Sequence, residues 1–295
     1  MKMFDKADIA ERIGTDIKKS KTLHHLKDVE KYFIKLAEKH RLELEYDVVA
    51  MEIPYFKTIA YTEYCHSFMI KPLNNELRCK QWADAYADQI ETPVGYMEYF
   101  RNRITGGNAN KYEGMKDSGL EPREAVVVLV GSNKLKDFMC LNKMIFIKKT
   151  YKDDVYFKPH PLTTHQLVGE LRDILGEDIV LDRGVDLHSL MIGAEVVYTT
   201  HLSESAMYAV ALKKRVEPVD VYNKIQEGSF YHINKFLLTE RDPYEWADIA
   251  LRSPKCGLIN PEVDENWEQR MRDYFEYIMA ERERHKHKYV LSTGG

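Results

Sequence analysis

The sequence has few cysteines, no apolar run long enough to cross a membrane and no signal peptide. Its four cysteines among 295 residues lie far apart in the chain, which disfavours both a zinc site built on CxxC pairs and a disulfide framework. The N-terminal stretch is charged throughout and lacks the apolar core of a secretory signal. We therefore expect a cytoplasmic protein with free thiols and without a membrane span.

The chain also lacks an excess of positive charge and a P-loop. A formal net charge of -4 gives no general attraction to nucleic acid, although a local basic patch is compatible with it. The absence of GxxxxGK[ST] argues against a P-loop kinase or hydrolase. With 44% hydrophobic and 31% charged residues, the composition is that of a soluble globular protein, and the length is enough for two domains.

A stretch rich in Gly, Asn and Asp, TGGNANKYEGMKDSGLEP at residues 105–122, divides the chain. Such a composition predicts a loop or linker. We therefore expect an N-terminal domain over residues 1–122 and a C-terminal domain over residues 123–295. The N-terminal part reads mostly as helices, whose expected ranges are residues 16–40, 78–90 and 94–104.

The C-terminal part alternates between short β-branched runs and amphipathic stretches. Strands are expected at residues 124–130, 155–158, 178–182, 195–200 and 216–222. Helices are expected between them at 165–175, 186–194 and 203–215, followed by closing helices at 243–251 and 265–286. This alternation predicts an α/β fold with a doubly wound parallel sheet, whose ligands bind beyond the carboxyl ends of the strands.

Three polar corners follow three of these strands, at residues 131–133, 158–161 and 199–205. Ser203 is a plausible N-cap, and a helix N-terminus suits a phosphate because its backbone N–H groups are free. His160 stands between two prolines, which fix the backbone, and its imidazole can neutralise charge that builds on a leaving phosphate. We therefore expect an anion site where the corners meet.

Two of these motifs resemble a known group of enzymes. YFKPHP, followed by AEVVYTTHLSESAMYAVALKKRVEPV, is similar to the C-terminal half of GT-B-fold transferases. The pattern resembles the capsule-type sugar transferases, including polysialyl- and Kdo-transferases, and the teichoic-acid glycerophosphotransferases. The resemblance covers residues 125–222. It implies two Rossmann-like domains with a reduced, helix-rich N-terminal domain, and a metal-independent glycosyltransferase activity.

The resemblance also implies roles for the residues of the corners. His160 would contact the donor phosphate, and Ser203 and Ser205 would cradle it. Glu204 departs from the pattern, because relatives carry Ser or Thr there and a carboxylate repels a phosphate. Two interpretations stay open: Glu204 binds a ribose hydroxyl, or it is an acid that stabilises the helix N-terminus. The remaining expected donor-site residues are Lys158, Ser132, Thr200 and His201.

Each of these residues also has a simpler interpretation. His160 can be a turn residue at a strand end, and Lys158 a solvated charge. Thr200 and His201 can bond the nearby backbone and do nothing else. Ser132 can belong to an ordinary turn.

A transfer to a hydroxyl requires a base near the acceptor, which in GT-B enzymes comes from the N-terminal domain. The candidates are Asp47, Glu52, Glu63 and His66, and we favour Glu52 and Glu63. The chain shows no Asp-x-Asp metal motif. We therefore expect no essential metal and no cofactor, with a nucleotide-sugar as donor substrate.

The expected function is sugar transfer from a nucleotide-sugar to an acceptor hydroxyl. Our first acceptor hypothesis is a modified base, 5-hydroxymethylcytosine, in phage DNA inside a host cytoplasm, where the base would have to leave the stack. The basic end of the last helix, with Arg282, Arg284, Lys286 and Lys288, would then contact the DNA backbone, although it can also be a plain solvated helix end. The alternatives are a cell-surface polysaccharide acceptor, or a non-catalytic protein that binds nucleotides or nucleic acid.

Overall fold

A computed structural model describes residues 24–46, 58–71, 75–89, 91, 95–112, 114–117, 119–131, 139–220 and 230–290. Asp47, Glu52 and Ser132 lie outside these ranges. The chain forms two compact units. Unit 1 comprises the described residues within 23–96 and 247–295, and unit 2 those within 97–246. Each unit is described by itself.

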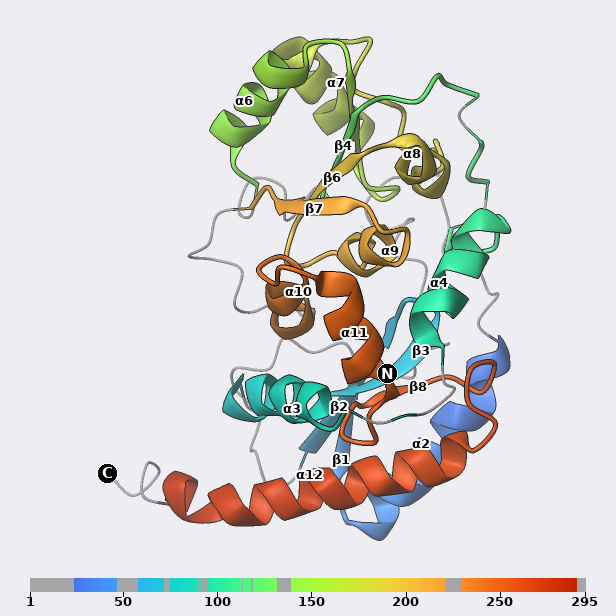
Figure 1. The fold of residues 1–295 in the computed structure, drawn as a ribbon, viewed down its shortest axis with the longest axis vertical. Coiled ribbons are helices and arrows are strands. Elements are labelled where there is room, and N and C mark those ends of the chain that lie inside the picture. The colour runs from blue at the N-terminus through green and yellow to red at the C-terminus, as the bar shows by residue number, and fades with distance from the viewer. Residues whose placement is uncertain are drawn as a thin grey trace. The chain divides into compact units, whose positions relative to one another are not determined.

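Unit 1 is built on a mixed sheet with the strand order β1-β2-β3-β8 (Figure 1). β1 pairs with β2 in parallel, whereas the β2–β3 and β3–β8 pairs are antiparallel. Cys65 and His66 form the turn between β2 and β3, with φ values of 49° and 57°, and positive φ at both positions is typical of a tight hairpin turn. The strands are β1 (Glu43–Tyr46), β2 (Thr58–Tyr64), β3 (Ser67–Lys71) and β8 (Leu258–Ile259).

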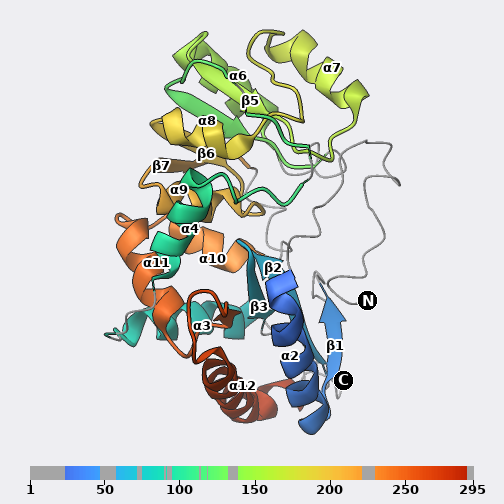
Figure 2. The same ribbon diagram turned by 90° about the vertical axis from the view of Figure 1, so that its right-hand side faces the viewer.

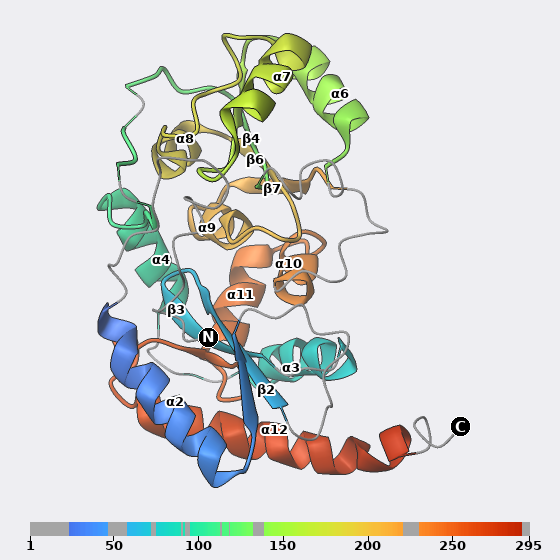
Figure 3. The ribbon, with the colours of Figure 1, turned by 180° about the vertical axis from the view of Figure 1, so that it is seen from behind.

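Helices cover the sheet of unit 1, and α2 crosses α12 beside it (Figure 3). Phe33 of α2 contacts the rings of Tyr61, Phe68 and Phe275, at centroid distances of 5.1, 5.1 and 5.6 Å. This aromatic cluster is the centre of the core of unit 1. The elements are η1 (His24–Leu26), α2 (Lys27–Lys39), α3 (Asn75–Ala87) and α12 (Trp267–Val290).

Unit 2 contains the parallel sheet that the sequence predicts, with the strand order β5-β4-β6-β7. All three strand pairs are parallel, which confirms an α/β fold. The expected strand at 178–182 appears only as a parallel bridge, which joins Val180 to Phe157 of β5. The strands are β4 (Ala125–Val128), β5 (Val155–Lys158), β6 (Val196–Thr199) and β7 (Arg215–Pro218).

Helices pack on both faces of this sheet (Figure 2). Ala125 and Val127 of β4 belong to a core shared with α6 and α7. Side chains alternate along a strand, so Val126 and Val128 point to the opposite face of the sheet. Two further helices contact the strands: α8 contacts β4, and α9 contacts β6 and β7. The helices of unit 2 are α6 (Leu141–Tyr151), α7 (His165–Leu175), α8 (Leu187–Gly193), α9 (Ser205–Ala211) and α10 (Tyr231–Leu237). Two more helices contain the points at which the chain passes from one unit to the other, α4 (Tyr96–Thr105) and α11 (Pro243–Arg252).

The two units divide the chain differently from the expected boundary at residue 122. Residues from 247 onward belong to unit 1, because β8 pairs with β3 and α12 contacts α2. The Gly- and Asn-rich stretch belongs to unit 2, where Lys116 forms a parallel bridge with Val185. The described residues of this stretch, 105–112, 114–117 and 119–122, therefore belong to unit 2. In the described part of the chain, no helix is long and apolar enough to cross a bilayer.

Candidate functional site

The two motif corners lie at the same edge of the unit 2 sheet. β5 and β6 both run parallel to β4, one on each side of it, so the loops that follow them leave from the same edge. With one strand between them, the ends of β5 and β6 lie about 10 Å apart. The strand order changes direction at β4, which makes this edge a topological switch point, where ligands of open α/β sheets bind.

A short segment at residues 110–112 contacts both corners. The Lys111 ammonium forms an ion pair with the Glu204 carboxylate, in the corner after β6. The hydroxyl of the next residue, Tyr112, lies 3.4 Å from His160 Nε2, in the corner after β5. Since neighbouring Cα atoms are about 3.8 Å apart, the segment joins the two corners within one short stretch of backbone.

The imidazole of His160 is held from both of its nitrogens. The Leu162 N–H donates to Nδ1 at 3.1 Å, and the Tyr112 ring packs edge-on against the imidazole with centroids 5.6 Å apart. The Thr163 N–H donates to the His160 carbonyl at 2.9 Å, which closes the turn at the prolines. Because Nδ1 accepts a hydrogen bond, the neutral ring carries its proton on Nε2.

Lys158 lies inside unit 2 and holds two loops together. Its ammonium donates to the carbonyls of Pro159 at 2.5 Å and Arg183 at 3.0 Å, and the residue is 2% exposed. Burial lowers the pKa of Lys158 to about 7, against the opposing effect of the Asp186 and Asp182 carboxylates. The expectation of a solvated strand-end charge is therefore wrong, and a phosphate could reach the buried Lys158 ammonium only if the loops around it opened.

The hydroxyls of the corner after β6 bond to one another. Ser205 Oγ lies 2.6 Å from Thr199 Oγ1 and 2.7 Å from Ser203 Oγ. Thr200 is buried, and its hydroxyl accepts the Leu202 N–H at 3.3 Å. The N-cap position of α9 is Glu204, one residue after the expected Ser203. These hydroxyls shape the turn, and of the three residues 200, 203 and 205 only Ser203 is partly exposed.

His201 is buried against a carboxylate. Its backbone N–H donates to Asp220 at 2.7 Å, and its Nδ1 lies 3.0 Å from both oxygens of that carboxylate. The Asn234 side chain donates to the carbonyls of His201 at 2.9 Å and Ser203 at 2.8 Å. The structure therefore places His201 inside unit 2, where it fixes the corner in place.

Glu204 is neutralised by a partner that sequence reasoning missed. The side chains of Lys111 and Glu204 are 13% and 21% exposed, so the ion pair is only partly buried. In the described part of the chain, Glu204 makes no capping hydrogen bond to the N-terminus of α9. Its charge therefore belongs to an ion pair, which reduces the repulsion expected between Glu204 and a phosphate.

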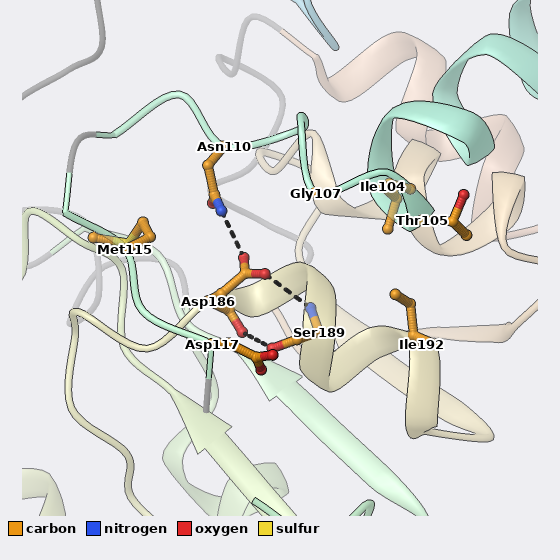
Figure 4. A pocket seen from close by; sticks show the side chains of 9 residues that line it. All are labelled: Ile104, Thr105, Gly107, Asn110, Met115, Asp117, Asp186, Ser189 and Ile192. Carbon is orange, nitrogen blue, oxygen red and sulfur yellow. Dashed lines mark hydrogen bonds between the residues drawn. The ribbon is translucent and has the colours of Figure 1, made fainter. Parts of the chain in front are cut away.

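A cavity of about 300 Å³ is lined in part by Asn110, the first residue of the 110–112 segment (Figure 4). Asn110 donates to Asp186 Oδ1 at 3.0 Å in this cavity. Burial alone would raise the pKa of Asp186, but hydrogen bonds from His188 and Asn110 lower it to about 2, so this wall is anionic. The lining residues are Ile104, Thr105, Gly107, Asn110, Met115, Asp117, Asp186, Ser189 and Ile192.

The expected residues of unit 1 lie apart from any described cavity. Glu63 is in β2 and 3% exposed. Arg282 is 4% exposed and donates to the Thr58 carbonyl at 2.7 Å. In this structure its guanidinium is therefore not available for the expected contact with DNA. Arg284 is exposed and donates to Glu281 at 2.5 Å, and the side chains of Lys286 and Lys288 lie outside the described part. No group of three His, Cys, Asp or Glu among the described residues is placed to hold a metal ion.

Comparisons with known proteins give distant structural likenesses. No protein-family model matches the chain, and no curated protein sequence matches it significantly. The β-Kdo 2,7 transferase of Thermosulfurimonas dismutans KpsC aligns with a TM-score of 0.42 and 13% identity, over 81% of this chain and 88% of that one. The β-Kdo 2,4 transferase of the same protein aligns at 0.37 and 14%, over 65% and 71%.

The wall teichoic acid polymerase TagF aligns with a TM-score of 0.28 and 13% identity, over 84% of this chain and 55% of that one. These names agree with the resemblance that the two sequence motifs predict.

Proposed function

We propose that the chain is a glycosyltransferase that moves a sugar from a nucleotide-sugar to an acceptor hydroxyl. The observation that carries this proposal is the meeting of the two motif corners at residues 110–112. His160 and Glu204 lie at the carboxyl edge of a parallel sheet, at its topological switch point, and consecutive residues of one segment contact them. A separation of about 10 Å between the strand ends suits a nucleoside diphosphate with its sugar.

The chemistry follows from the state of His160. Transfer breaks the bond between the sugar and the phosphate, and negative charge builds on the departing phosphate oxygen. The Nε2–H of His160 can donate a hydrogen bond to that oxygen and stabilise its charge, because Nδ1 is already occupied by the Leu162 N–H. Ser203 adds a partly exposed hydroxyl. The dipole of α9 contributes little to this proposal, because the helix has only seven residues.

The acceptor side of the proposal rests on a carboxylate base. Glu63 is almost fully buried, so an acceptor hydroxyl cannot reach it in this conformation. Of the two candidates that the sequence favours, we propose Glu52 as the base. The base would take the proton of the acceptor hydroxyl as the new bond to the sugar forms.

For the acceptor we propose a carbohydrate hydroxyl of a polysaccharide. The hypothesis of an acceptor in phage DNA placed the basic end of α12 against the DNA backbone, and Arg282 there is buried and bound to a carbonyl. A polysaccharide acceptor needs no such basic surface, because its hydroxyl groups carry no phosphate charge. We also propose that transfer needs no metal.

The experiment that tests the function is a donor screen. The purified chain is mixed with a panel of nucleotide-sugars, and release of free nucleotide is followed with and without polysaccharide acceptors, in buffer and in chelator. We expect slow release from one donor that an acceptor accelerates, unchanged by chelator. Binding of nucleotides without any release would instead identify a non-catalytic binding protein, and loss of release in chelator with rescue by a divalent cation would overturn the metal-independent mechanism.

A further inference from the structure

Two of the cations near the motif corners already hold the loops together. Lys158 is buried and donates to the carbonyls of Pro159 and Arg183. Arg183 is also buried, donates to the Thr163 carbonyl at 3.1 Å and lies 2.5 Å from His165 Nε2. Both side chains are buried, so a phosphate could reach either cation only if these loops opened and gave up their bonds to carbonyl groups, which is costly.

Lys111 differs from both, because its partner is a carboxylate at the corner itself. The pair with Glu204 is only partly buried, so solvent and ligands can reach it. The ammonium carries a positive charge and N–H donors, which are the groups that bind a phosphate. The adjacent residue, Tyr112, contacts His160, which places Lys111 beside the proposed donor site.

We propose that Lys111 binds the phosphate of the donor, and that Glu204 is a positioning residue that holds its ammonium at the corner. This inference rests on the proposed function. A lysine held in place before the ligand arrives loses less side-chain freedom on binding. Glu204 also repels the phosphate, so the ion pair lowers the affinity for phosphate while it fixes the position of the Lys111 ammonium. The carboxylate at a position where relatives carry Ser or Thr thereby gains a physical role.

The test measures phosphate affinity with inorganic pyrophosphate as the probe, by titration calorimetry on the full chain. Lys111→Gln should weaken binding by about tenfold or more, since a charge-assisted bond is lost. Glu204→Gln keeps the shape of the side chain, removes the repulsion and should tighten binding. Lys116→Gln is the matched control, because it removes an exposed lysine of the same stretch, and its affinity should stay within about twofold of the unmodified chain, as expected for a screened charge.

We expect the pyrophosphate affinity to fall in Lys111→Gln and to rise in Glu204→Gln. If the ion pair served only to hold the fold, loss of either partner would weaken binding in the same way. Unchanged affinity of Lys111→Gln, or equal weakening by Lys111→Gln and Glu204→Gln, would overturn the inference and leave the proposed function standing. Failure of the unmodified chain to bind pyrophosphate and every nucleotide-sugar of the donor panel would overturn both. Circular dichroism of each variant confirms that it is folded before its affinity is compared.

Discussion

His160 is oriented by one backbone amide and one phenol. The Leu162 N–H holds Nδ1, and the Tyr112 hydroxyl lies next to Nε2. Neither contact is needed to build the sheet, because β5 ends at Lys158, before the turn begins. The imidazole should therefore matter more for turnover than for stability.

Replacing His160 by Ala should lower turnover by about 100-fold or more, as is usual for the loss of a hydrogen-bond donor to charge that develops in the reaction. Initial rates of donor release and transfer measure the effect, and thermal unfolding shows whether the fold is kept. Tyr112→Phe is the companion variant: it keeps the edge-on ring and removes the hydroxyl, so its rate should fall less. A His160→Ala protein with near-normal turnover would remove the imidazole from the mechanism.

Lys158 should make stability depend on pH in the alkaline range. Its pKa is about 7 in the folded chain and about 10.4 when unfolded, so the unfolded state binds more protons between these values. The free energy of unfolding should therefore rise with pH from about 7 to about 10. Lys158→Met cannot titrate and should lack this rise, which urea unfolding of both proteins across the window measures. A constant difference between the two proteins would contradict the lowered pKa.

At the scale of single elements, α8 depends on its cap. Asp186 accepts the N–H groups of His188 at 3.0 Å and Ser189 at 3.1 Å. Asp186→Ala should therefore lower the free energy of unfolding by about 1–2 kcal/mol at neutral pH, the usual cost of losing an N-cap.

Asp186→Asn is the matched variant, because Asn also caps helices but carries no charge. With a folded pKa of about 2 and an unfolded value of about 3.9, the Asp186 contribution is complete above the unfolded value. It should be lost as pH falls from about 4 to about 2. In urea unfolding, the gap between the unmodified chain and Asp186→Asn should close on acidification, and a gap independent of pH would count against the lowered pKa.

Local patterns predicted the elements of unit 2 well. β4 and β5 are fully buried, so their continuous apolar residues are visible in the sequence, and α7 shows a clear apolar stripe. The strand expected at 178–182 formed only a bridge at Val180. The antiparallel pair of β2 and β3 was not recognised, because both strands are buried throughout and show no alternation.

The candidate site was predicted in part. The His-Pro and Ser/Thr corners were found because each follows a recognisable strand, and the parallel order of the sheet then fixes their common edge. The inward turn of Lys158 and the burial of His201 depend on partners, Arg183 and Asp220, that are distant in the sequence. Residues 110–112 lie in a stretch whose composition indicates only a loop, so its contacts were not foreseeable.

At the scale of the whole molecule, unit 1 is assembled from both ends of the described chain. β8 pairs with β3 across Phe68–Ile259 and Met69–Leu258, and Phe275 of α12 packs against Phe33 of α2. These pairings join residues about two hundred positions apart, which no local pattern reveals. Pairings of this kind did not enter the boundary that the sequence predicts at residue 122.

Deleting the chain after residue 246 should therefore damage unit 1 and spare unit 2. The deletion removes β8 and α12, whose Leu258 and Phe275 are buried in unit 1. Hydrogen exchange followed by mass spectrometry should show loss of protection in peptides from β2 and β3, and retained protection in β4 and β6. Intact protection of β2 and β3 in the shortened chain would be the contrary result.

Asn234 donates to two main-chain oxygens of the corner after β6, those of His201 and Ser203. Neither hydrogen bond involves the side chain of Leu202, which lies between those two residues. A laboratory library at residue 202 therefore varies one side chain of the corner and leaves both of these hydrogen bonds in place.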